Sequence, residues 1–301
     1  MSKSHYKSLD AAKREFRVLK IAAADQQDRL KKLELSATVQ RIGDETHYWA
    51  LSYTWGKPVP TFTVSLNGID FDVQQNLYEA LQHFRPLTGS VTIWVDAICI
   101  NQADTAEREA QVAMMRDIYA GAAMVYAWLG PGHNSTQTRK AFVLMSELAE
   151  REMSDGKIDS VYFINSRRET RDWVAERLST TQEVEAWLAM ADVLDSPWFC
   201  RMWIIQEIVM AKDILVVCGD VAASWDEVVY LAGKFLEKYT GTFILKEVGD
   251  TSVSALRKVL RTKYAAIQEA ARSISEIGRA RNVRRDVPLL PAEEVSMTRH
   301  L

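Results

Sequence analysis

Short apolar runs alternate with amphipathic segments along residues 14–219, and this alternation predicts the elements of the fold. The runs with the length and composition of strands are 14–21, 33–39, 48–55, 91–100, 124–130 and 214–219. Residues 61–73 predict a β-hairpin, because Asn67-Gly68 at their centre suits the positive φ angles of a tight turn. The run 91–100 is too uniformly apolar for a half-exposed strand, so we expect it to be buried on both faces.

Apolar residues at helical spacing predict helices between these strands. One helix is expected to begin at Asn76, as its N-cap, and to end before Pro86. A second is expected from Thr105 to Tyr119, with four residues facing inward: Val112, Met115, Ile118 and Tyr119. Further helices are expected at 225–239 and 252–277.

The order strand, helix, strand, helix, strand predicts an α/β fold with parallel strands joined by right-handed crossovers. We expect a mostly parallel central sheet flanked by helices. An N-terminal β-strand extension is expected at 1–46 and an α/β core at 47–225. That core contains a helical insertion at 131–196, and a C-terminal helical region follows at 226–301.

Composition narrows the class of protein. A hydrophobic fraction of 48% in 301 residues is sufficient for one large core or two smaller ones. With 26% charged residues and a formal net charge of −3, nothing predicts specific nucleic-acid binding. No apolar run approaches the roughly 20 residues of a membrane span, and the N-terminus lacks the apolar core of a secretory signal. The three widely spaced cysteines are typical of free thiols in a reducing compartment, so we expect a cytoplasmic location.

Polar and aromatic residues gather where three of the apolar segments end. They are Ser52, Tyr53, Trp55 and Gly56, then Asp96, Asn101 and Gln102, and finally Arg201, Trp203 and Glu207 in the segment RMWIIQE. Open α/β sheets bind ligands in the crevice outside the carboxyl ends of their strands. The pattern therefore predicts that these residues share one crevice.

The two carboxylates also have structural interpretations. Glu207 follows Trp203 by four residues, so a helix would place both on one face. A carboxylate entering an apolar helix needs a partner or a function, and pairing with a nearby arginine would satisfy it. Asp96 either lies at the mouth of the sheet or holds the following loop through backbone amides.

The neutral residues leave the same choice open. Ser52 and Tyr53 are explained equally well as buried hydroxyls bonded to neighbouring strands. Asn101 and Gln102 suit an amide or ribose ligand, but they could also cap the helix at Thr105. Gly56 favours the crevice, because glycine permits close backbone approach beside the indole of Trp55.

Other common sites are absent from the sequence. There is no G-x-G-x-x-G or G-x-x-x-x-G-K-[ST] phosphate loop and no G-x-S-x-G elbow. The five histidines show no metal-ligand spacing with one another or with the cysteines, so no metal is expected. Cys99 lies in an apolar run without a nearby histidine, which argues against a thiol nucleophile.

The blocks resemble the HET domain of fungal heterokaryon-incompatibility proteins in wording and order. Those motifs are Y-x-x-L at 6–9, ALSYTWG at 50–56, WVDAICINQ at 94–102 followed by Glu107-Arg108, IY-x-x-A at 118–122, WLG at 128–130 and R-x-W-x-x-QE at 201–207. The resemblance implies a role in non-self recognition and regulated cell death. Members of that family usually continue into a further T-D-x-R-D-x-V-Y-A-L-like stretch, so we expect a truncated or minimal module.

A more distant resemblance is to TIR domains, several of which cleave NAD at the nicotinamide–ribose bond with a glutamate. It relates Ser52-Tyr53 to the Ser-Tyr pair ending the first TIR strand and Asp96 to the acid ending the second. Trp203 and Glu207 correspond to the Trp-x-x-x-Glu helix. The resemblance implies a TIR-like or flavodoxin-like core, with NAD as a substrate rather than a cofactor and Glu207 as the catalytic residue.

The chemistry is consistent with these residue types. Nicotinamide leaves as a neutral pyridine, so one carboxylate that stabilises the oxocarbenium charge is sufficient, unlike the pair of ordinary glycosidases. An indole stacks favourably on a cationic ring, and Arg201 or Lys57 suits a pyrophosphate. The rival interpretation is a non-enzymatic module that recruits a cell-death partner. The expected partners are further copies of the chain and an upstream incompatibility or NLR-type receptor.

Overall fold

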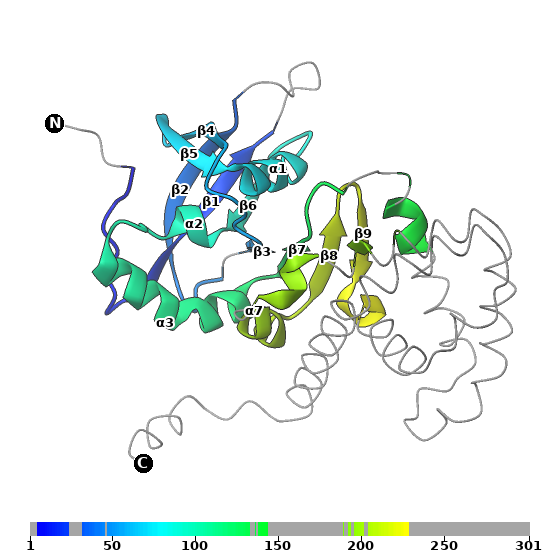
Figure 1. The fold of residues 1–301 in the computed structure, drawn as a ribbon. Coiled ribbons are helices and arrows are strands. Elements are labelled where there is room, and N and C mark those ends of the chain that lie inside the picture. Colours follow the sequence, from blue (N-terminus) through cyan, green and yellow to red (C-terminus); the bar gives the residue numbers. More distant parts are fainter. Residues whose placement is uncertain are drawn as a thin grey trace, which may run out of the picture.

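The computed structural model describes residues 5–23, 32–45, 47–132, 136, 138–143, 189, 192–193, 196–201 and 204–228. Within these residues, nine strands form one sheet in the spatial order β5-β4-β2-β1-β6-β3-β7-β8-β9 (Figure 1). The strands are β1 Glu15–Ala22, β2 Glu34–Arg41, β3 Trp49–Tyr53, β4 Thr61–Leu66, β5 Ile69–Gln74, β6 Ser90–Trp94, β7 Met124–Trp128, β8 Ile214–Cys218 and β9 Val221–Ser224. The α/β class predicted from the sequence is confirmed.

The sheet is mixed, which corrects the expectation of a mostly parallel one. The four adjacent strands β6, β3, β7 and β8 run parallel to one another, as the strand–helix alternation predicts. By contrast, β1 is antiparallel to both β2 and β6, and the hairpins β4–β5 and β8–β9 are antiparallel pairs. Tight turns can join only antiparallel strands, and Asn67 and Gly68 have φ angles of 55° and 79° in the predicted one.

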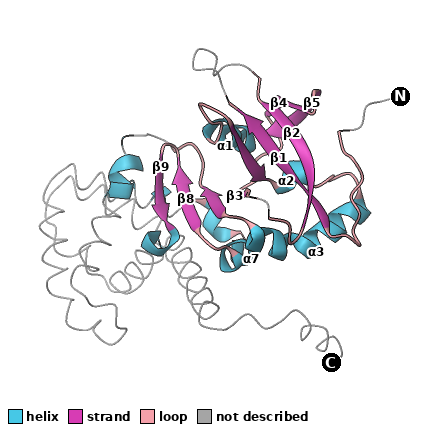
Figure 2. Cartoon of the chain, turned by 180° about the vertical axis from the view of Figure 1, so that it is seen from behind, coloured by secondary structure: helices cyan, strands magenta, loops and turns pink. Residues whose placement is uncertain are grey.

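The chain reverses its direction across the sheet at β3. From β3 it proceeds to β6 on one side and then to β7 on the other. Right-handed crossovers therefore place α1 (Gln75–His83) on one face and α3 (Thr105–Gly121) on the other. Helix α7 (Ile204–Met210) packs beside α3 (Figures 1 and 2). The carboxyl end of β3 is thus the switch point at which open sheets bind ligands.

Alternation along β3 decides which face each side chain meets. The Trp49 ring lies 4.8 Å from that of Tyr126, which in turn lies 4.8 Å from the Phe84 ring at the end of α1. Ser52, an odd number of residues further on, points to the opposite face, toward α7. The strand consequently delivers one hydroxyl to the α3–α7 side of the sheet.

The predicted strand at 91–100 is shorter than expected. Strand β6 ends at Trp94, and Asp96–Cys99 form the single-turn helix α2. The amides of Ile98 and Cys99 donate to the Val95 carbonyl, which turns the chain out of the sheet. A uniformly apolar run does not distinguish a buried strand from a strand followed by a buried turn, and here Asp96 marks the boundary.

The predicted helix caps are also wrong. Helix α1 begins at Gln75, and the Asn76 side chain instead donates to the Thr54 carbonyl at 2.6 Å and accepts from the Trp128 indole at 2.9 Å. Asp104, rather than Asn101 or Gln102, caps α3 by accepting from the Glu107 amide at 3.1 Å. Asn76 therefore joins the ends of β3 and β7.

A buried ion pair fixes α3 to the N-terminal strands. Arg17 of β1 is 2% exposed and donates to the Glu107 carboxylate at 2.5 and 2.9 Å. It also donates to the Cys99 carbonyl at 3.0 Å, so one side chain holds α2 and α3 against β1. The predicted N-terminal strands belong to the same sheet as the core.

Parts of the predicted organisation fall beyond the described residues. Most of the insertion at 131–196 and nearly all of the C-terminal region at 226–301 lie outside them. The division into domains stays a prediction. Cys99 and Cys218 are buried free thiols, and no helix in the described part of the chain is long and apolar enough to cross a membrane.

Candidate functional site

The Glu207 carboxylate lies against the carboxyl end of β3. Its side chain is 1% exposed, and the Ser52 hydroxyl donates a hydrogen bond to its Oε2. Arg201 binds the same carboxylate with both guanidinium nitrogens, Nη2 to Oε1 at 2.9 Å and Nη1 to Oε2 at 3.2 Å. Glu207 thus joins helix α7 to strand β3. As expected from the sequence, it has an arginine partner and lies close to the end of β3.

Besides Glu207 and Arg201, Ser52 binds a third side chain, that of Trp198, which the sequence did not single out. The Trp198 indole donates to Ser52 Oγ at 2.8 Å, and Arg201 Nη1 lies 3.3 Å from the same atom. Trp198 belongs to the short 3-10 helix Pro197–Cys200 and is fully buried. The signal that could have revealed it is the aromatic pair Trp198-Phe199 directly before RMWIIQE.

Asp96 begins α2 and collects three donors. The Trp55 indole donates to its Oδ2 at 2.9 Å, and the Ala97 amide donates to its Oδ1 at 2.7 Å. The Tyr53 hydroxyl also hydrogen-bonds to this carboxylate. The end of β3 and the start of α2 are therefore tied together by one side chain, as both interpretations of Asp96 require.

The other predicted residues are placed less centrally. Gln102 Nε2 donates to the Asp96 carbonyl at 2.9 Å. Asn101 accepts from the Ala103 amide at 3.3 Å and shapes its own loop. Gly56 has a φ of +81° where the chain leaves β3, and a Cβ there would lie 3.7 Å from the Cβ of Asn76. Trp203 lies outside the described residues.

A pocket of about 380 Å³ opens beside these groups. The predicted residues that line it are Trp55, Asp96, Gln102, Arg201 and Glu207. Its other lining residues are Thr54, Ile100, Arg108, Val112 and Met115. Ser52 and Tyr53 are buried behind the wall and reach it through their hydrogen bonds to Glu207 and Asp96, whereas Asn101 and Gly56 are not part of the lining. The volume is within the range of small-molecule sites.

Burial sets the electrostatics of the pocket. It raises the pKa of Glu207, and the Arg201 guanidinium and the Ser52 hydroxyl act against that rise. Burial likewise raises the pKa of Asp96, opposed first by the indole hydrogen bond from Trp55. The Tyr53 hydroxyl is held well above its ordinary pKa by burial and stays protonated as a donor. Carboxylates with raised pKa values in a concave site are typical of functional centres, although buried ion-pair networks produce them too.

The arrangement restricts the chemistry that the pocket can perform. One buried carboxylate, one carboxylate nearer the opening and two guanidinium groups can stabilise opposite charges on a ligand at the same time. Among the described residues, no group of three or more His, Cys, Asp or Glu is placed to hold a metal ion. The pocket therefore offers charge stabilisation and hydrogen bonding.

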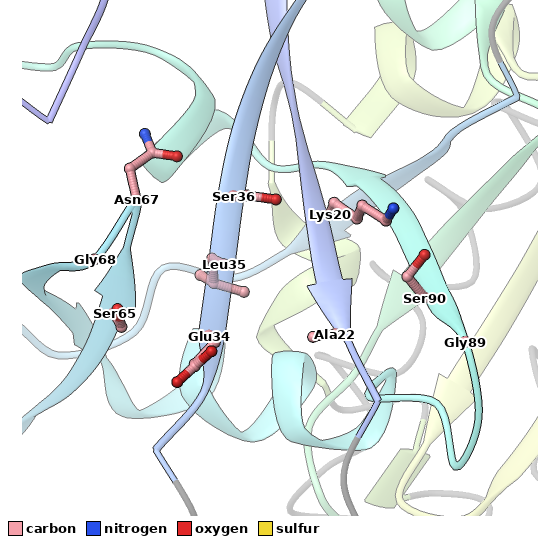
Figure 3. Close-up of a pocket in the computed structure, with 10 residues that line it drawn as sticks. All are labelled: Lys20, Ala22, Glu34, Leu35, Ser36, Ser65, Asn67, Gly68, Gly89 and Ser90. Carbon is pink, nitrogen blue, oxygen red and sulfur yellow. The ribbon is translucent and has the colours of Figure 1, made fainter.

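A second hollow of about 760 Å³ lies over β1, β2, β4 and β6, away from these residues (Figure 3). Figure 3 shows that its two charged residues, Lys20 and Glu34, point away from each other, with Lys20 toward Ser90. The remaining lining is small or polar, with Ser36, Ser65 and Gly89 among its members. No convergent set of charged groups is present there.

The sequence missed the helical wall of the first pocket. Arg108, Val112 and Met115 of α3 recur at i, i+4 and i+7 and line it together. Val112 was expected in the core, but its side chain is 39% exposed. The helical spacing was visible in the sequence, although it could not show that this face borders a pocket.

The model of the heterokaryon incompatibility protein (HET) family matches residues 48–207, which include every residue described at the first pocket. The chain belongs to the HET family. This HET-family chain is similar to "Heterokaryon incompatibility protein 6, OR allele" of Neurospora crassa, with 29% identity over 205 residues. That alignment covers 59% of this chain and 29% of the relative, so the chain matches less than a third of the relative's length. No solved structure matches this HET-family chain.

Proposed function

We propose that this HET-family protein acts in fungal non-self recognition and regulated cell death, and that its pocket cleaves NAD at the nicotinamide–ribose bond. Membership of the HET family and the similarity to a heterokaryon incompatibility protein support the first part. The second part depends on one observation. Glu207, Asp96, Trp55 and Arg201 line a single pocket at the switch point of the sheet.

In the proposed reaction, the bond between the ribose C1′ and the nicotinamide nitrogen breaks, and its electron pair leaves with nicotinamide. Positive charge develops on the ribose, where the Glu207 carboxylate stabilises it. A water molecule adds its oxygen to C1′ and releases a proton to solvent. The leaving group is neutral, so the second carboxylate of ordinary glycosidases is not needed as an acid.

The ion pair with Arg201 shapes this role. It opposes the rise that burial causes in the pKa of Glu207, because a nearby guanidinium favours the charged form. In the proposed mechanism, a bound ribose competes with Arg201 and Ser52 for the carboxylate oxygens. The TIR likeness of Ser52-Tyr53, Asp96 and Glu207 agrees with a TIR-like or flavodoxin-like core. We further propose that self-association in the cytoplasm switches the activity on, as in TIR-type assemblies.

One observation favours the non-enzymatic alternative. Each carboxylate in the pocket is already satisfied, Glu207 by Arg201 and Ser52, and Asp96 by Trp55 and Ala97. Such a network is also what a purely structural junction between β3, α2 and α7 requires. In that case the surface around the pocket would recruit a cell-death partner, with an upstream incompatibility or NLR-type receptor as the activator.

Nicotinamide release separates these functions. The purified protein is incubated with NAD at high protein concentration with a crowding agent, and nicotinamide is followed by chromatography. The enzyme proposal expects release that is lost in Glu207→Gln and kept in Glu109→Gln, an exposed control on α3. Circular dichroism of both variants shows whether the fold is intact. Absence of release under every assembly condition contradicts the enzyme and leaves the recruiting module.

A further inference from the structure

The α3 wall of the pocket contains a cation that the proposed reaction does not use. Arg108 lines the pocket together with Val112 and Met115 on the same helical face. Its neighbour Glu107 points in a different direction, toward β1, where Arg17 and the Asn101 amide bind that carboxylate. The buried pair therefore fixes the rotation of α3 that directs Arg108 to the pocket.

Arg108 retains most of its binding capacity. The contact that the structure gives it is Nη1 to the Gln102 carbonyl at 3.5 Å, beyond the usual hydrogen-bond range. No salt bridge to Arg108 is formed within the described residues. The other guanidinium in the pocket, Arg201, is neutralised by Glu207. Arg108 is thus an exposed fork of donors that matches an oxyanion.

Apolar surface also lines this pocket. Trp55 is 41% exposed and Val112 is 39% exposed, and both contribute to the lining. The indole is held by its hydrogen bond to Asp96, so its position is fixed before a ligand arrives. An oriented aromatic surface and a guanidinium without a carboxylate partner in one pocket suit a ligand that has a flat ring and a phosphate.

We propose that Arg108 binds the diphosphate of a nucleotide ligand, with Trp55 and Val112 against one of its flat rings. The proposal rests on the proposed function for the choice of a nicotinamide dinucleotide as the natural ligand. It assigns Arg108 as the residue that selects phosphorylated ligands over the free nucleoside. Glu207 then acts on the ribose, while Ser52 holds the Glu207 carboxylate from behind the wall.

Calorimetry with ADP-ribose, inorganic pyrophosphate and nicotinamide riboside tests the assignment. We expect Arg108→Gln to weaken binding of ADP-ribose and pyrophosphate by about tenfold or more, because it removes a charge-assisted hydrogen bond. Nicotinamide riboside, which has no phosphate, binds unchanged. Arg116→Gln is the matched control, since Arg116 is an exposed arginine of α3 outside the pocket. Val112→Ala weakens ADP-ribose but not pyrophosphate.

The possible outcomes separate this assignment from the enzyme proposal. If Arg108→Gln binds ADP-ribose as tightly as the unchanged protein, or if the folded protein binds neither phosphate ligand, the assignment is overturned. If ADP-ribose binding depends on Arg108 but no nicotinamide is released from NAD, the assignment stands and the hydrolase does not. Nicotinamide release that is unaffected by Arg108→Gln, together with unchanged ADP-ribose binding, leaves the hydrolase and overturns the assignment.

Discussion

The Ser52 hydroxyl donates a hydrogen bond to the carboxylate of Glu207, a residue 155 positions later in the chain. This contact joins the end of β3 to α7 at a buried point. It brings two of the sequence motifs into direct contact. The same serine accepts from the Trp198 indole, so three separate segments depend on one oxygen atom.

Ser52→Ala is expected to destabilise the protein by about 1–3 kcal/mol, because it leaves the buried Trp198 indole nitrogen without its acceptor. The free energy of unfolding in urea measures the effect. Ser36→Ala, at an exposed position on β2, is the control and should change stability by less than about 0.5 kcal/mol. Equal effects of the two substitutions would show that the hydrogen bonds of Ser52 contribute nothing.

Arg201→Gln is expected to cost about 3–5 kcal/mol, since it removes the counter-ion of the buried Glu207 carboxylate. The double variant Arg201→Gln/Glu207→Gln should recover part of this loss, because two amides require far less solvation than an isolated carboxylate. Urea unfolding of the single and double variants gives the coupling energy. Strict additivity of the two substitutions would contradict a direct interaction.

Activity should fall on the acid side at a pH above the ordinary pKa of a glutamate side chain. Burial raises the pKa of Glu207, and the proposed reaction needs the ionised form, so activity falls as the pH drops through that raised pKa. The sign for stability is opposite. A raised native pKa means that the folded state binds this proton more tightly, so protonation of Glu207 favours folding.

Nicotinamide release as a function of pH, with circular dichroism at each point, checks both statements. Ser52→Ala should move the acid side further upward, because the serine hydrogen bond lowers this pKa. Loss of activity only in the range of an exposed carboxylate would contradict the expectation.

Gly219→Ala tests the contact between the β8–β9 turn and the loop that follows β7. Gly219 has a φ of +58°, and a Cβ there would lie 2.5 Å from the Pro131 carbonyl oxygen. Gly68→Ala in the β4–β5 turn has a comparable positive φ of +79° with nothing within 4 Å of the added carbon. Each substitution puts a Cβ at a positive φ, which costs about 1–2 kcal/mol of stability. Gly219→Ala should destabilise the protein more than Gly68→Ala, because its Cβ also clashes with the Pro131 carbonyl oxygen. Equal melting temperatures would show that the Pro131 loop moves away freely.

The strands were largely predictable because their signals are local. The hairpin at Asn67-Gly68 and the buried runs of β1, β3, β7 and β8 follow from turn chemistry and apolar pattern. The pairing of β1 between β2 and β6 was not predictable, because it depends on long-range contacts such as Arg17 to Glu107. Strand β9 is four residues long and was missed altogether.

The sequence predicted which residues form the candidate site better than it predicted the hydrogen bonds between them. The sequence named Ser52, Asp96 and Glu207 as neighbours; in the structure Asp96 and Glu207 line one pocket, and Ser52 bonds to Glu207 behind its wall. It could not show that Trp198 is the indole that bonds to Ser52. It also could not assign Val112 to a pocket wall, because an apolar helical position has the same pattern in a core and beside a ligand.

The position of β1 has a practical consequence for fragment design. The family match starts at residue 48, yet β1 (Glu15–Ala22) is an interior strand of the sheet, and its Arg17 neutralises Glu107. A fragment that begins at residue 48 would lack β1 and so expose the edge of β6 that β1 covers. It would also leave the partly buried Glu107 without Arg17. The segment that the family model matches therefore lacks a strand that covers β6 and the cation that pairs with Glu107.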